Sequence, residues 1–328
     1  MVKFLIIRFS SIGDIVLTTP VVRAIKSQIK NAEIHYLTKV HFRFLLETNP
    51  YIDKIHTLND NFNELIKELQ IEQFDHIIDL HHNLRSGKVK RALSIPAFTL
   101  DKLNIQKWLL VNLKLNRMPN KHIVDRYLDT LNVFDIKNDN EGLDYFIPEK
   151  DQFEFSNQPF EKNKYIAFVL GATYFTKQIP IDLASNIINK YELPTILLGG
   201  KDDVEKSEEL MRLLKNKAYN FCGKINLNQS ASLIEHAKIV VSSDTGLMHI
   251  AAAFNKPVVS LWGNTVPEFG MSVYKPHTDS KIFEITDLKC RPCSKIGFNK
   301  CPKKHFKCMN LQNSDAISKY IRTIYFES

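Results

Sequence analysis

The fold is decided by the stretch Phe4-Leu-Ile-Ile-Arg-Phe-Ser-Ser-Ile-Gly-Asp-Ile-Val-Leu-Thr-Thr-Pro20, in which a polar turn separates an apolar run from an apolar helical pattern. A second stretch of the same design, Ile239-Val-Val-Ser-Ser-Asp-Thr-Gly-Leu-Met-His-Ile-Ala-Ala-Ala-Phe254, lies near the other end of the chain. Each is typical of a strand, a turn and a helix, the Rossmann-like unit that aims loop atoms and a helix N-terminus at a ligand. Two such units in separate halves predict two lobes that serve one reaction.

Apolar runs alternate with helical patterns along the rest of the chain, which predicts an α/β protein with parallel, doubly wound sheets. Expected strands cover 2–9, 33–37, 76–80, 165–170, 195–198, 238–242 and 257–261. Expected helices cover 15–29, 61–69, 122–134, 182–191, 204–215, 228–236, 246–254 and 315–325. Pro20 is compatible with the first of these helices only in its first turns or at a kink.

The length of 328 residues suits two domains, since domains usually have ~100–200 residues. The segment 148–163 contains Pro148 and Pro159 and shows little periodicity, so it reads as a linker. We therefore expect one domain at 1–155 and another at 156–328.

The formal charge of +8 favours an anionic partner. Segment 281–308 carries eight Lys or Arg residues against two acids, although such segments are often only solvated surface. No apolar run approaches the ~18 residues of a membrane span. Arg8 and Asp14 interrupt the first apolar stretch, which argues against a signal peptide. These features favour a cytoplasmic protein, with peripheral membrane contact as a further option.

The two polar turns contain the candidate site residues. Asp14 follows Gly13 at the point where a strand ends and a helix begins, so it is either a helix cap or a carboxylate placed for chemistry. Thr245 and Gly246 offer backbone N–H groups at a helix start, where a phosphate binds well. His249 lies one turn further on, and Asp244 is again open to a capping role.

With these stretches the chain resembles glycosyltransferase family 9, the heptosyltransferase family of lipopolysaccharide inner-core assembly. The first match is Ser10-Ser-Ile-Gly-Asp-Ile-Val-Leu-Thr-Thr-Pro20, and the last motif begins at Asp244-Thr-Gly-Leu-Met-His249. Further matching pieces keep the family order and are Asp79-Leu-His-His-Asn-Leu-Arg-Ser86, Thr176-Lys-Gln-Ile-Pro180, Leu198-Gly-Gly-Lys-Asp-Asp-Val-Glu205 and Pro257-Val-Val-Ser-Leu-Trp-Gly-Asn-Thr-Val-Pro267.

The resemblance implies a GT-B fold, in which two Rossmann-like domains face each other across a cleft. It implies an acceptor-binding domain at 1–155 and a nucleotide-sugar-binding domain at 156–328. In many such chains the final helix packs on the first domain. The expected reaction is an inverting transfer of heptose from ADP-heptose to a lipopolysaccharide core acceptor, without a cofactor. Expected partners are the nucleotide sugar, a lipid-linked saccharide and the cytoplasmic face of the inner membrane, but no nucleic acid.

The resemblance also implies roles for individual residues. Asp14 would be the catalytic base, which takes the proton of the attacking hydroxyl. The donor would be bound through Lys177, Glu205, Asp244, Thr245, Gly246 and His249, which hold the departing diphosphate and its ribose. The acceptor would be bound through Ser10, Ser11, Gly13 and Arg85, whose guanidinium suits carboxylates and phosphates. Taken alone, Lys177 and Glu205 also fit surface positions, and His249 fits the core.

Four cysteines close together near the C-terminus need a separate interpretation. Cys290 and Cys293 are two residues apart, and Cys301 and Cys308 follow after seven and six residues. Four thiolates can hold a structural zinc ion, but the second pair lacks the usual short spacing. Free thiols and labile disulfides are the alternatives. Cys222 fits a small core residue.

Other functions remain open from the residues. The donor can be another nucleotide sugar, used for a different cell-surface glycan. A basic, zinc-stapled nucleic-acid-binding module is a second class, but Phe298 and Phe306 alone make a thin stacking platform. A dehydrogenase is disfavoured because the first turn lacks the G-x-G-x-x-G pattern.

Overall fold

The first sheet consists of five parallel strands in the order β3-β2-β1-β4-β5. The computed structural model describes residues 1–58 and 61–327, and this sheet belongs to a unit of residues 1–103 and 121–146. The strands are β1 (Val2–Ile7), β2 (Ala32–Lys39), β3 (Lys54–Leu58), β4 (His76–Asp79) and β5 (Ala97–Thr99). The β1 run from Phe4 to Ile7 is fully buried, as expected of a central parallel strand covered on both faces.

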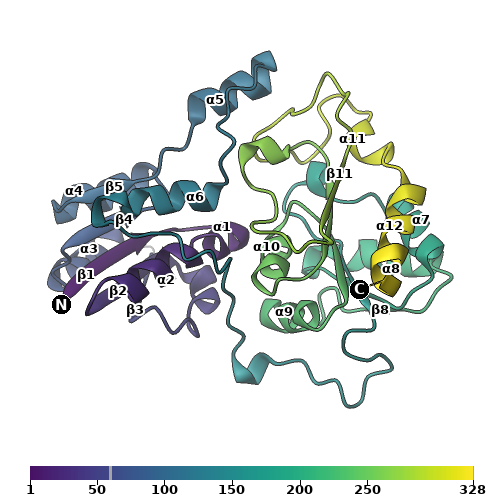
Figure 1. Ribbon diagram of the computed structural model, residues 1–328, viewed down its shortest axis with the longest axis horizontal. Coiled ribbons are helices and arrows are strands. Elements are labelled where there is room, and N and C mark those ends of the chain that lie inside the picture. The colour runs from purple at the N-terminus through teal and green to yellow at the C-terminus, as the bar shows by residue number, and fades with distance from the viewer. Residues whose placement is uncertain (59–60, 328) are drawn as a thin grey trace. The chain divides into compact units, whose positions relative to one another are not determined.

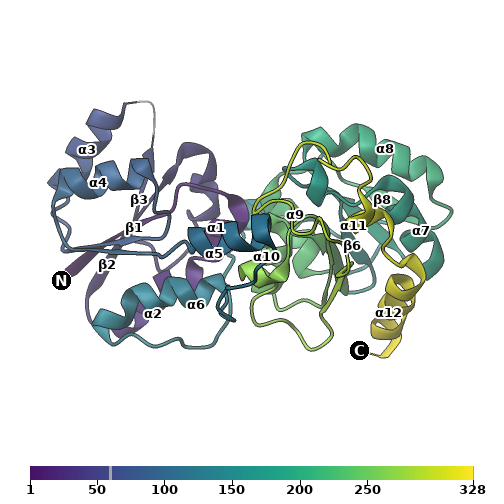
Figure 2. The same ribbon diagram turned by 90° about the horizontal axis from the view of Figure 1, so that it is seen from above.

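Helices cover both faces of this sheet: Figure 2 shows α3 and α4 on one side and α2 and α6 on the other. The helical segments are α1 (Ile12–Val16), α2 (Thr19–Gln28), α3 (Phe62–Ile71), α4 (Leu84–Leu93) and α6 (Ile123–Leu128), with 3-10 turns η1 (Val40–Leu45) and η3 (Asp129–Phe134). The core on the α3 and α4 side is built from strand residues such as Leu5, Ile7 and Ile77 and from Leu65 and Val89 of the helices.

The second sheet consists of six parallel strands in the order β11-β10-β9-β6-β7-β8, within a unit of residues 104–120 and 147–328. The strands are β6 (Ile166–Val169), β7 (Thr195–Leu198), β8 (Ala218–Asn220), β9 (Ile239–Ser243), β10 (Val258–Trp262) and β11 (Lys281–Glu284). In chain order this is the 3-2-1-4-5-6 arrangement of a doubly wound Rossmann sheet.

Figure 1 shows α7, α8 and α12 on one side of the second sheet and α9 and α10 on the other. The helices are α5 (Asn104–Trp108), α7 (Ile181–Tyr191), α8 (Val204–Leu213), α9 (Leu227–Glu235), α10 (Gly246–Ala253), α11 (Lys307–Asn310) and α12 (Ser314–Glu327). Shorter turns are the π-helical η2 (Leu109–Leu113) and the 3-10 segments η4 (Glu149–Asp151), η5 (Phe175–Lys177), η6 (Lys201–Asp203) and η7 (Pro267–Phe269). None of the helices within 1–58 and 61–327 has both the length and the apolarity needed to cross a bilayer.

Two expected helices are divided in the structure. The pattern at 15–29 forms α1 and α2, and Pro20 lies in the first turn of α2, where its missing N–H breaks no helical hydrogen bond. The pattern at 122–134 begins as α6 and tightens into the 3-10 segment η3. The expected positions were right, but the continuity of both helices was wrong.

The units do not follow the expected boundary between residues 155 and 156. Residues 104–120 belong to the second unit, because Leu110 packs against Val266 and Phe269 and the Lys114 ammonium donates to the Pro292 carbonyl at 2.6 Å. The first unit ends at residue 146. The final helix α12 packs on α7 of the second unit, not on the first domain as the GT-B pattern allowed.

In each sheet, successive strands are first added on one side of the first strand and then on its other side. The place where the order reverses is called the switch point, and ligands of open α/β sheets bind there, beyond the carboxyl ends of the strands. In the first unit this point lies between β1 and β4, and in the second between β6 and β9. The loops after these four strands are therefore where a site is expected.

Candidate functional site

Asp14 lies just beyond the carboxyl end of β1, at the switch point of the first sheet. Helix α1 begins at Ile12 with Ser11 as its N-cap, so Asp14 is not the cap itself. Its Oδ2 accepts hydrogen bonds from the Ser11 backbone N–H at 3.1 Å and the Ser11 hydroxyl at 2.7 Å. Gly13 is buried beneath this turn. Asp14 thus stabilises the start of α1 through Ser11, and both of these hydrogen bonds go to Oδ2.

The other oxygen of Asp14 is paired with Arg8, a residue that the sequence analysis did not select. The Arg8 Nη2 lies 2.6 Å from Asp14 Oδ1. The remaining guanidinium nitrogens donate to the carbonyls of Ser10 and Leu80 and to the Tyr127 hydroxyl, at 2.8, 2.6 and 3.0 Å. Burial alone lowers the pKa of Arg8, but the Asp14 carboxylate together with Tyr127 and Tyr36 outweighs burial, so the pKa is raised. The available signal was a charged residue between the apolar run at 4–7 and Phe9.

Asp79 ends β4 on the other side of the switch point and is fully buried. Its oxygens accept from the backbone N–H groups of His81 and His82 at 3.0 and 2.7 Å, from the Ser86 hydroxyl at 2.8 Å, and from Lys90 at 2.9 Å. Burial alone raises the pKa of this carboxyl, but the hydrogen bonds and Lys90 outweigh it and lower the pKa. Asp79 therefore organises the turn into α4, and Lys90 is a structural cation.

Arg85 and His81 both lie close to the turn from β4 to α4, but Arg85 faces solvent and the ring of His81 is packed inward. Arg85, the predicted acceptor residue, is exposed in the first turn of α4. His81 lies with its ring edge against Phe9, and its Nδ1 is buried without a hydrogen-bond partner among the described residues. Burial, followed by the charge of Arg8, lowers the pKa of His81 to about 4. The imidazole is neutral at pH 7, and it joins Arg8 as a residue that the sequence reasoning missed.

The second cluster of predicted residues surrounds the start of α10, at the switch point of the second sheet. Thr245 is the N-cap, and its hydroxyl accepts weakly from the Met248 N–H at 3.4 Å and lies 3.0 Å from the Ser242 hydroxyl. Helix α10 begins at Gly246, and the first N–H groups of a helix have no partner within it. This end of α10 can therefore bind an anion through N–H groups and the helix dipole.

Lys177 and Asp244 are in direct contact, although 66 residues separate them in the sequence. The Lys177 ammonium lies 2.5 Å from Asp244 Oδ2, and the Thr265 hydroxyl donates to the same oxygen at 2.9 Å. Lys177 ends η5 after β6, and Asp244 follows β9. Asp244 is thus not a helix cap: it positions the lysine beside the start of α10. Thr265 is a further residue that the sequence did not single out.

A buried acid near the ends of two other strands was also missed. Asp203 lies where β6 and β7 end, and its Oδ2 accepts from the Gly200 N–H at 2.8 Å. A Cβ added to Gly171 would lie 2.6 Å from that oxygen, and one added to Gly199 would lie 2.9 Å from it. The two glycines therefore make room for the carboxylate, whose pKa is raised by burial. The signal was the pair of glycines that follow the strands.

The two remaining donor predictions are not distinguished by their surroundings. Glu205 is exposed in the first turn of α8, which fits either a ribose ligand or a surface acid at a helix start. His249 is buried on α10, which fits either a core histidine or a ligand turned inward. Both roles stay predictions.

The cysteine segment brings its thiols near one another. All five cysteines are free. Burial raises the pKa of Cys293, and the neighbouring thiols Cys290 and Cys301 raise it further; burial also raises the pKa of Cys308, to about 12. In the described part of the chain, however, no three of these thiols and His305 come within 4.8 Å of one another. Zinc at this segment stays a prediction.

Arg291 anchors the cysteine segment to the end of β10. Its guanidinium donates to the carbonyls of Gly263 and Thr265 at 2.6 and 2.9 Å and pairs with Glu284 at 2.5 Å. These contacts tie the cysteine segment to the strand end through one side chain.

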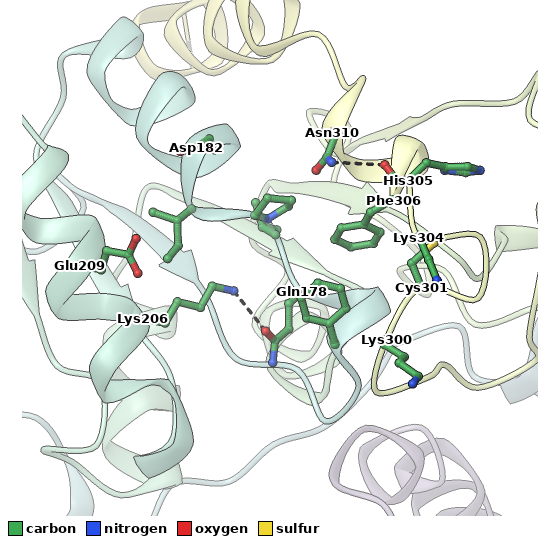
Figure 3. Close-up of a pocket in the computed structure, with 14 residues that line it drawn as sticks. Gln178, Asp182, Lys206, Glu209, Lys300, Cys301, Lys304, His305, Phe306 and Asn310 are labelled. Carbon is green, nitrogen blue, oxygen red and sulfur yellow. Dashed lines mark hydrogen bonds between the residues drawn. The ribbon is translucent and has the colours of Figure 1, made fainter.

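A cavity of about 670 Å³ lies beside this segment. Figure 3 shows its lining residues, which come from η5, the starts of α7 and α8, and the loop at 300–310. Lys206 points toward Gln178 and donates to its side-chain oxygen at 3.4 Å. Burial lowers the pKa of Lys206 to about 8. None of the predicted donor residues lines this cavity, so it is distinct from the cluster at the start of α10.

Comparison with known proteins places this architecture. The sequence matches the family model for glycosyltransferase family 9 (heptosyltransferase) over residues 62–303. Lipopolysaccharide heptosyltransferase 1 of Campylobacter coli is 26% identical over 355 aligned positions, covering 98% of this chain and 99% of the relative. A glycosyltransferase of family 9 from Veillonella parvula has a TM-score of 0.82 at 19% identity, covering 99% and 98% of the two chains. The ADP-heptose LPS heptosyltransferase II of E. coli has a TM-score of 0.75 at 19% identity, covering 99% of each.

Two parallel α/β domains shared with these structures define the GT-B class of glycosyltransferases. The predicted fold class is confirmed. The family model covers most of the sequence, and the chain belongs to glycosyltransferase family 9, the heptosyltransferase family. The resemblance drawn from the motifs is likewise confirmed, and the protein is a glycosyltransferase.

Proposed function

We propose that this chain transfers a heptose from ADP-heptose to a lipopolysaccharide core acceptor, with inversion at the anomeric carbon. Support comes from membership in the heptosyltransferase family and from the names of its relatives. The observation that carries the proposal is the Lys177–Asp244 pair beside the open start of α10, at the switch point of the second sheet. A cation next to unpaired helix N–H groups suits a diphosphate.

On the donor side, Lys177 and the N–H groups of Thr245 and Gly246 would stabilise the charge that grows on the departing ADP. Asp244 would hold the Lys177 ammonium in place, since both are largely buried. His249 would contribute a further donor to the diphosphate, and Glu205 would bind the ribose. These roles explain why a lysine and an acid from distant loops are paired at this position.

On the acceptor side, Asp14 would be the base. The attacking hydroxyl gives its proton to the carboxylate while its oxygen bonds to the anomeric carbon and the bond to ADP breaks on the opposite face. One such displacement inverts the configuration. Arg8 would act as a positioning residue that holds one Asp14 oxygen, while Ser10, Ser11, Gly13 and Arg85 contact the acceptor.

The proposal is tested by the purified protein with ADP, GDP, UDP and ADP-heptose. Thermal melts are expected to shift upward with ADP and ADP-heptose, because a ligand that binds only the folded state stabilises it by mass action. A transfer assay with a heptose-deficient core acceptor should then release ADP. A selective shift with UDP or GDP would instead assign another donor, and release of no nucleotide from any donor would exclude the transfer.

We also propose that the enzyme contacts an anionic membrane through residues 102–121. This segment carries five cations and no acid in the sequence. Leu110 anchors it to the second unit, whereas Ile105, Trp108, Leu113 and Leu115 are each more than half exposed. Exposed apolar side chains among lysines suit an interface with acidic lipids, where the acceptor would be embedded.

The contact is measured with vesicles. Of the two tryptophans, Trp262 is fully buried, so a change in emission on adding vesicles would report on Trp108. A blue shift is expected with phosphatidylglycerol vesicles and not with phosphatidylcholine alone, and the double variant Ile105→Ser/Leu113→Ser should weaken it. Val133→Ser, at an exposed apolar residue outside the segment, is the control. Equal binding by the double variant would contradict this contact.

A further inference from the structure

Two buried histidines face each other on neighbouring strands of the first sheet. His35 on β2 and His56 on β3 are each 1% exposed, and His35 Nδ1 lies 2.9 Å from His56 Nε2. Glu72, the C-cap of α3, brings its Oε2 to 3.9 Å from the same His35 nitrogen. One ligand atom from each of the three residues lies within 4.8 Å of the others. Two strands and a helix end thus converge on one point.

The outer nitrogens of both rings are held by carboxylates. Glu33 Oε1 lies 2.7 Å from His35 Nε2, and Glu68 Oε1 lies 2.6 Å from His56 Nδ1. An imidazole that donates its outer N–H to a carboxylate presents its inner nitrogen as a lone pair, which is the usual arrangement around metal-bound histidines. Here two such pairs point their inner nitrogens at each other.

The proton count makes this arrangement unusual without a cation. Each carboxylate contact needs a proton on the outer nitrogen, and the contact between His35 and His56 needs a third proton. Two neutral imidazoles carry only two protons, so the full set requires an additional positive charge in a buried place. A metal ion between the inner nitrogens supplies that charge and removes the need for a shared proton.

The surrounding charges also favour a cation. Glu33, Glu68 and Glu72 contribute three carboxylates, whereas Lys3 and Lys54 contribute two ammonium groups. Lys3 lies 3.3 Å from Glu33, and Lys54 pairs with Glu72 through Oε1. Glu72 Oε2 lies 3.8 Å from the Lys3 ammonium and 3.9 Å from His35 Nδ1, so a metal ion between the histidines would compete with Lys3 for this oxygen. Glu68 is half exposed.

We propose that His35 Nδ1, His56 Nε2 and Glu72 Oε2 bind a divalent transition-metal ion, with zinc as the best fit. Two imidazoles and a carboxylate are a recurrent zinc ligand set, and water can take the fourth position. Tetrahedral zinc needs its ligand nitrogens about 3.3 Å apart, so the pair need open only slightly from 2.9 Å.

The role of this ion is structural. Glu72 precedes β4 and Lys3 lies near the start of β1, so the cluster lies toward the amino ends of these strands. Asp14, in contrast, follows the carboxyl end of β1. The metal would join β2, β3 and the end of α3, and it takes no part in the transfer reaction.

The experiment is an equilibrium zinc titration of the full-length, chelator-treated protein, with bound zinc counted after dialysis and its affinity measured by competition with a chromophoric chelator. His56→Gln and Glu72→Gln are expected to bind one zinc ion fewer per chain than the wild type. Glu68→Gln should retain the site with about 10–100-fold weaker affinity, as for other outer-shell carboxylates. His41→Gln and Glu47→Gln alter exposed residues of the same unit and should match the wild type.

The cysteines require their own comparison, since thiolates also bind zinc. The double variant Cys290→Ser/Cys293→Ser should keep the ion assigned to His35, His56 and Glu72, and cobalt in that variant should give visible absorption without thiolate charge-transfer bands. Circular dichroism verifies that each variant is folded. If His56→Gln unfolds, the zinc content of Glu72→Gln tests the site instead, because Glu72 is partly exposed and its substitution disturbs the core less. Unchanged zinc content in Glu72→Gln, or a wild-type protein that binds no zinc, would overturn the proposal.

Discussion

At the scale of single residues, the first switch point is organised by Arg8. Its guanidinium holds Asp14 through Oδ1 and is itself fixed by two carbonyls and the Tyr127 hydroxyl. A planar fork with fixed donors orients a carboxylate more firmly than an ammonium does. Asp14 is thus held from two directions, by Arg8 and by Ser11.

We expect Asp14→Asn to lower kcat by about 10²–10⁴-fold, the usual contribution of a general base, with little change in KM for the donor. Arg8→Lys should lower kcat less, because lysine keeps the positive charge beside Asp14 and loses only the planar set of guanidinium N–H donors. Steady-state kinetics at saturating acceptor measure both effects. Melting curves must accompany them, since Asp14→Asn leaves the buried Arg8 without its partner.

A wild-type kcat in Asp14→Asn would remove the base from its proposed role. Asp129→Asn serves as the matched control, because this acid forms an exposed pair with Lys121.

At the scale of elements, the strands that could be predicted from the sequence are the buried central ones. The central strands β1, β6, β9 and β10 are apolar because helices cover both faces, and all were expected. The four unexpected strands β3, β5, β8 and β11 are the edge strands of the two sheets. An edge strand is short and partly exposed, so its residues carry no strong apolar pattern. Pairing with a neighbour, which is a tertiary contact, makes it a strand.

The turn from β4 to α4 depends on Asp79, and we expect Asp79→Asn to destabilise the fold by about 2–4 kcal/mol at pH 7, because it leaves Lys90 and the bonded N–H groups with a weaker acceptor. The pKa of Asp79 is lower in the folded chain than in the unfolded chain. Its contribution is therefore complete above about pH 4, the unfolded value, and is lost as the pH falls further. Denaturant unfolding at pH 7 and at acid pH measures this difference.

The gap in stability between wild type and Asp79→Asn should narrow in acid. Asp129→Asn, at an exposed ion pair, should change stability by less than about 1 kcal/mol. A gap that stays constant across the pH range would show that the Asp79 charge is not what stabilises the turn.

At the scale of the whole molecule, the chain is two doubly wound units that each have a switch point with polar residues. The segment 104–120 departs from the sequential division, because Leu110 and Lys114 find their partners near residues 266 and 292. No local pattern encodes such a distant partner. The sequence therefore could not assign this segment to the second unit. Separately, the first unit ends at residue 146, earlier than the boundary expected from the linker.

If the donor binds as proposed, ADP should protect backbone amides of the second unit from hydrogen exchange, chiefly at residues 171–177 and 244–249. Binding stabilises the folded state by about 2.7 kcal/mol at a ligand concentration of 100 Kd, which is ample for detection. The measurement is exchange followed by mass spectrometry with and without ADP. Lys177→Ala should lose most of the protection, because it removes the cation at the start of α10.

Lys238→Ala, at a lysine on the same unit that lies over the Tyr325 ring, provides the comparison and should retain the protection. Protection concentrated in the first unit would contradict the placement of the donor site.

The sequence by itself determined the class of fold and the family, and it singled out the candidate site residues, because these depend on local order. An apolar strand, a Gly-containing turn and a helix are contiguous in the chain, and both Asp14 and the Thr245-Gly246 pair belong to such units. Only the tertiary structure decided which residues meet. The partners of Arg8 include Leu80 and Tyr127, Lys177 pairs with Asp244, and His35 faces His56, because parallel strands bring residues from distant parts of the chain to one level of a sheet. Short-range periodicity records burial, but it carries no information about which distant side chain will be the neighbour.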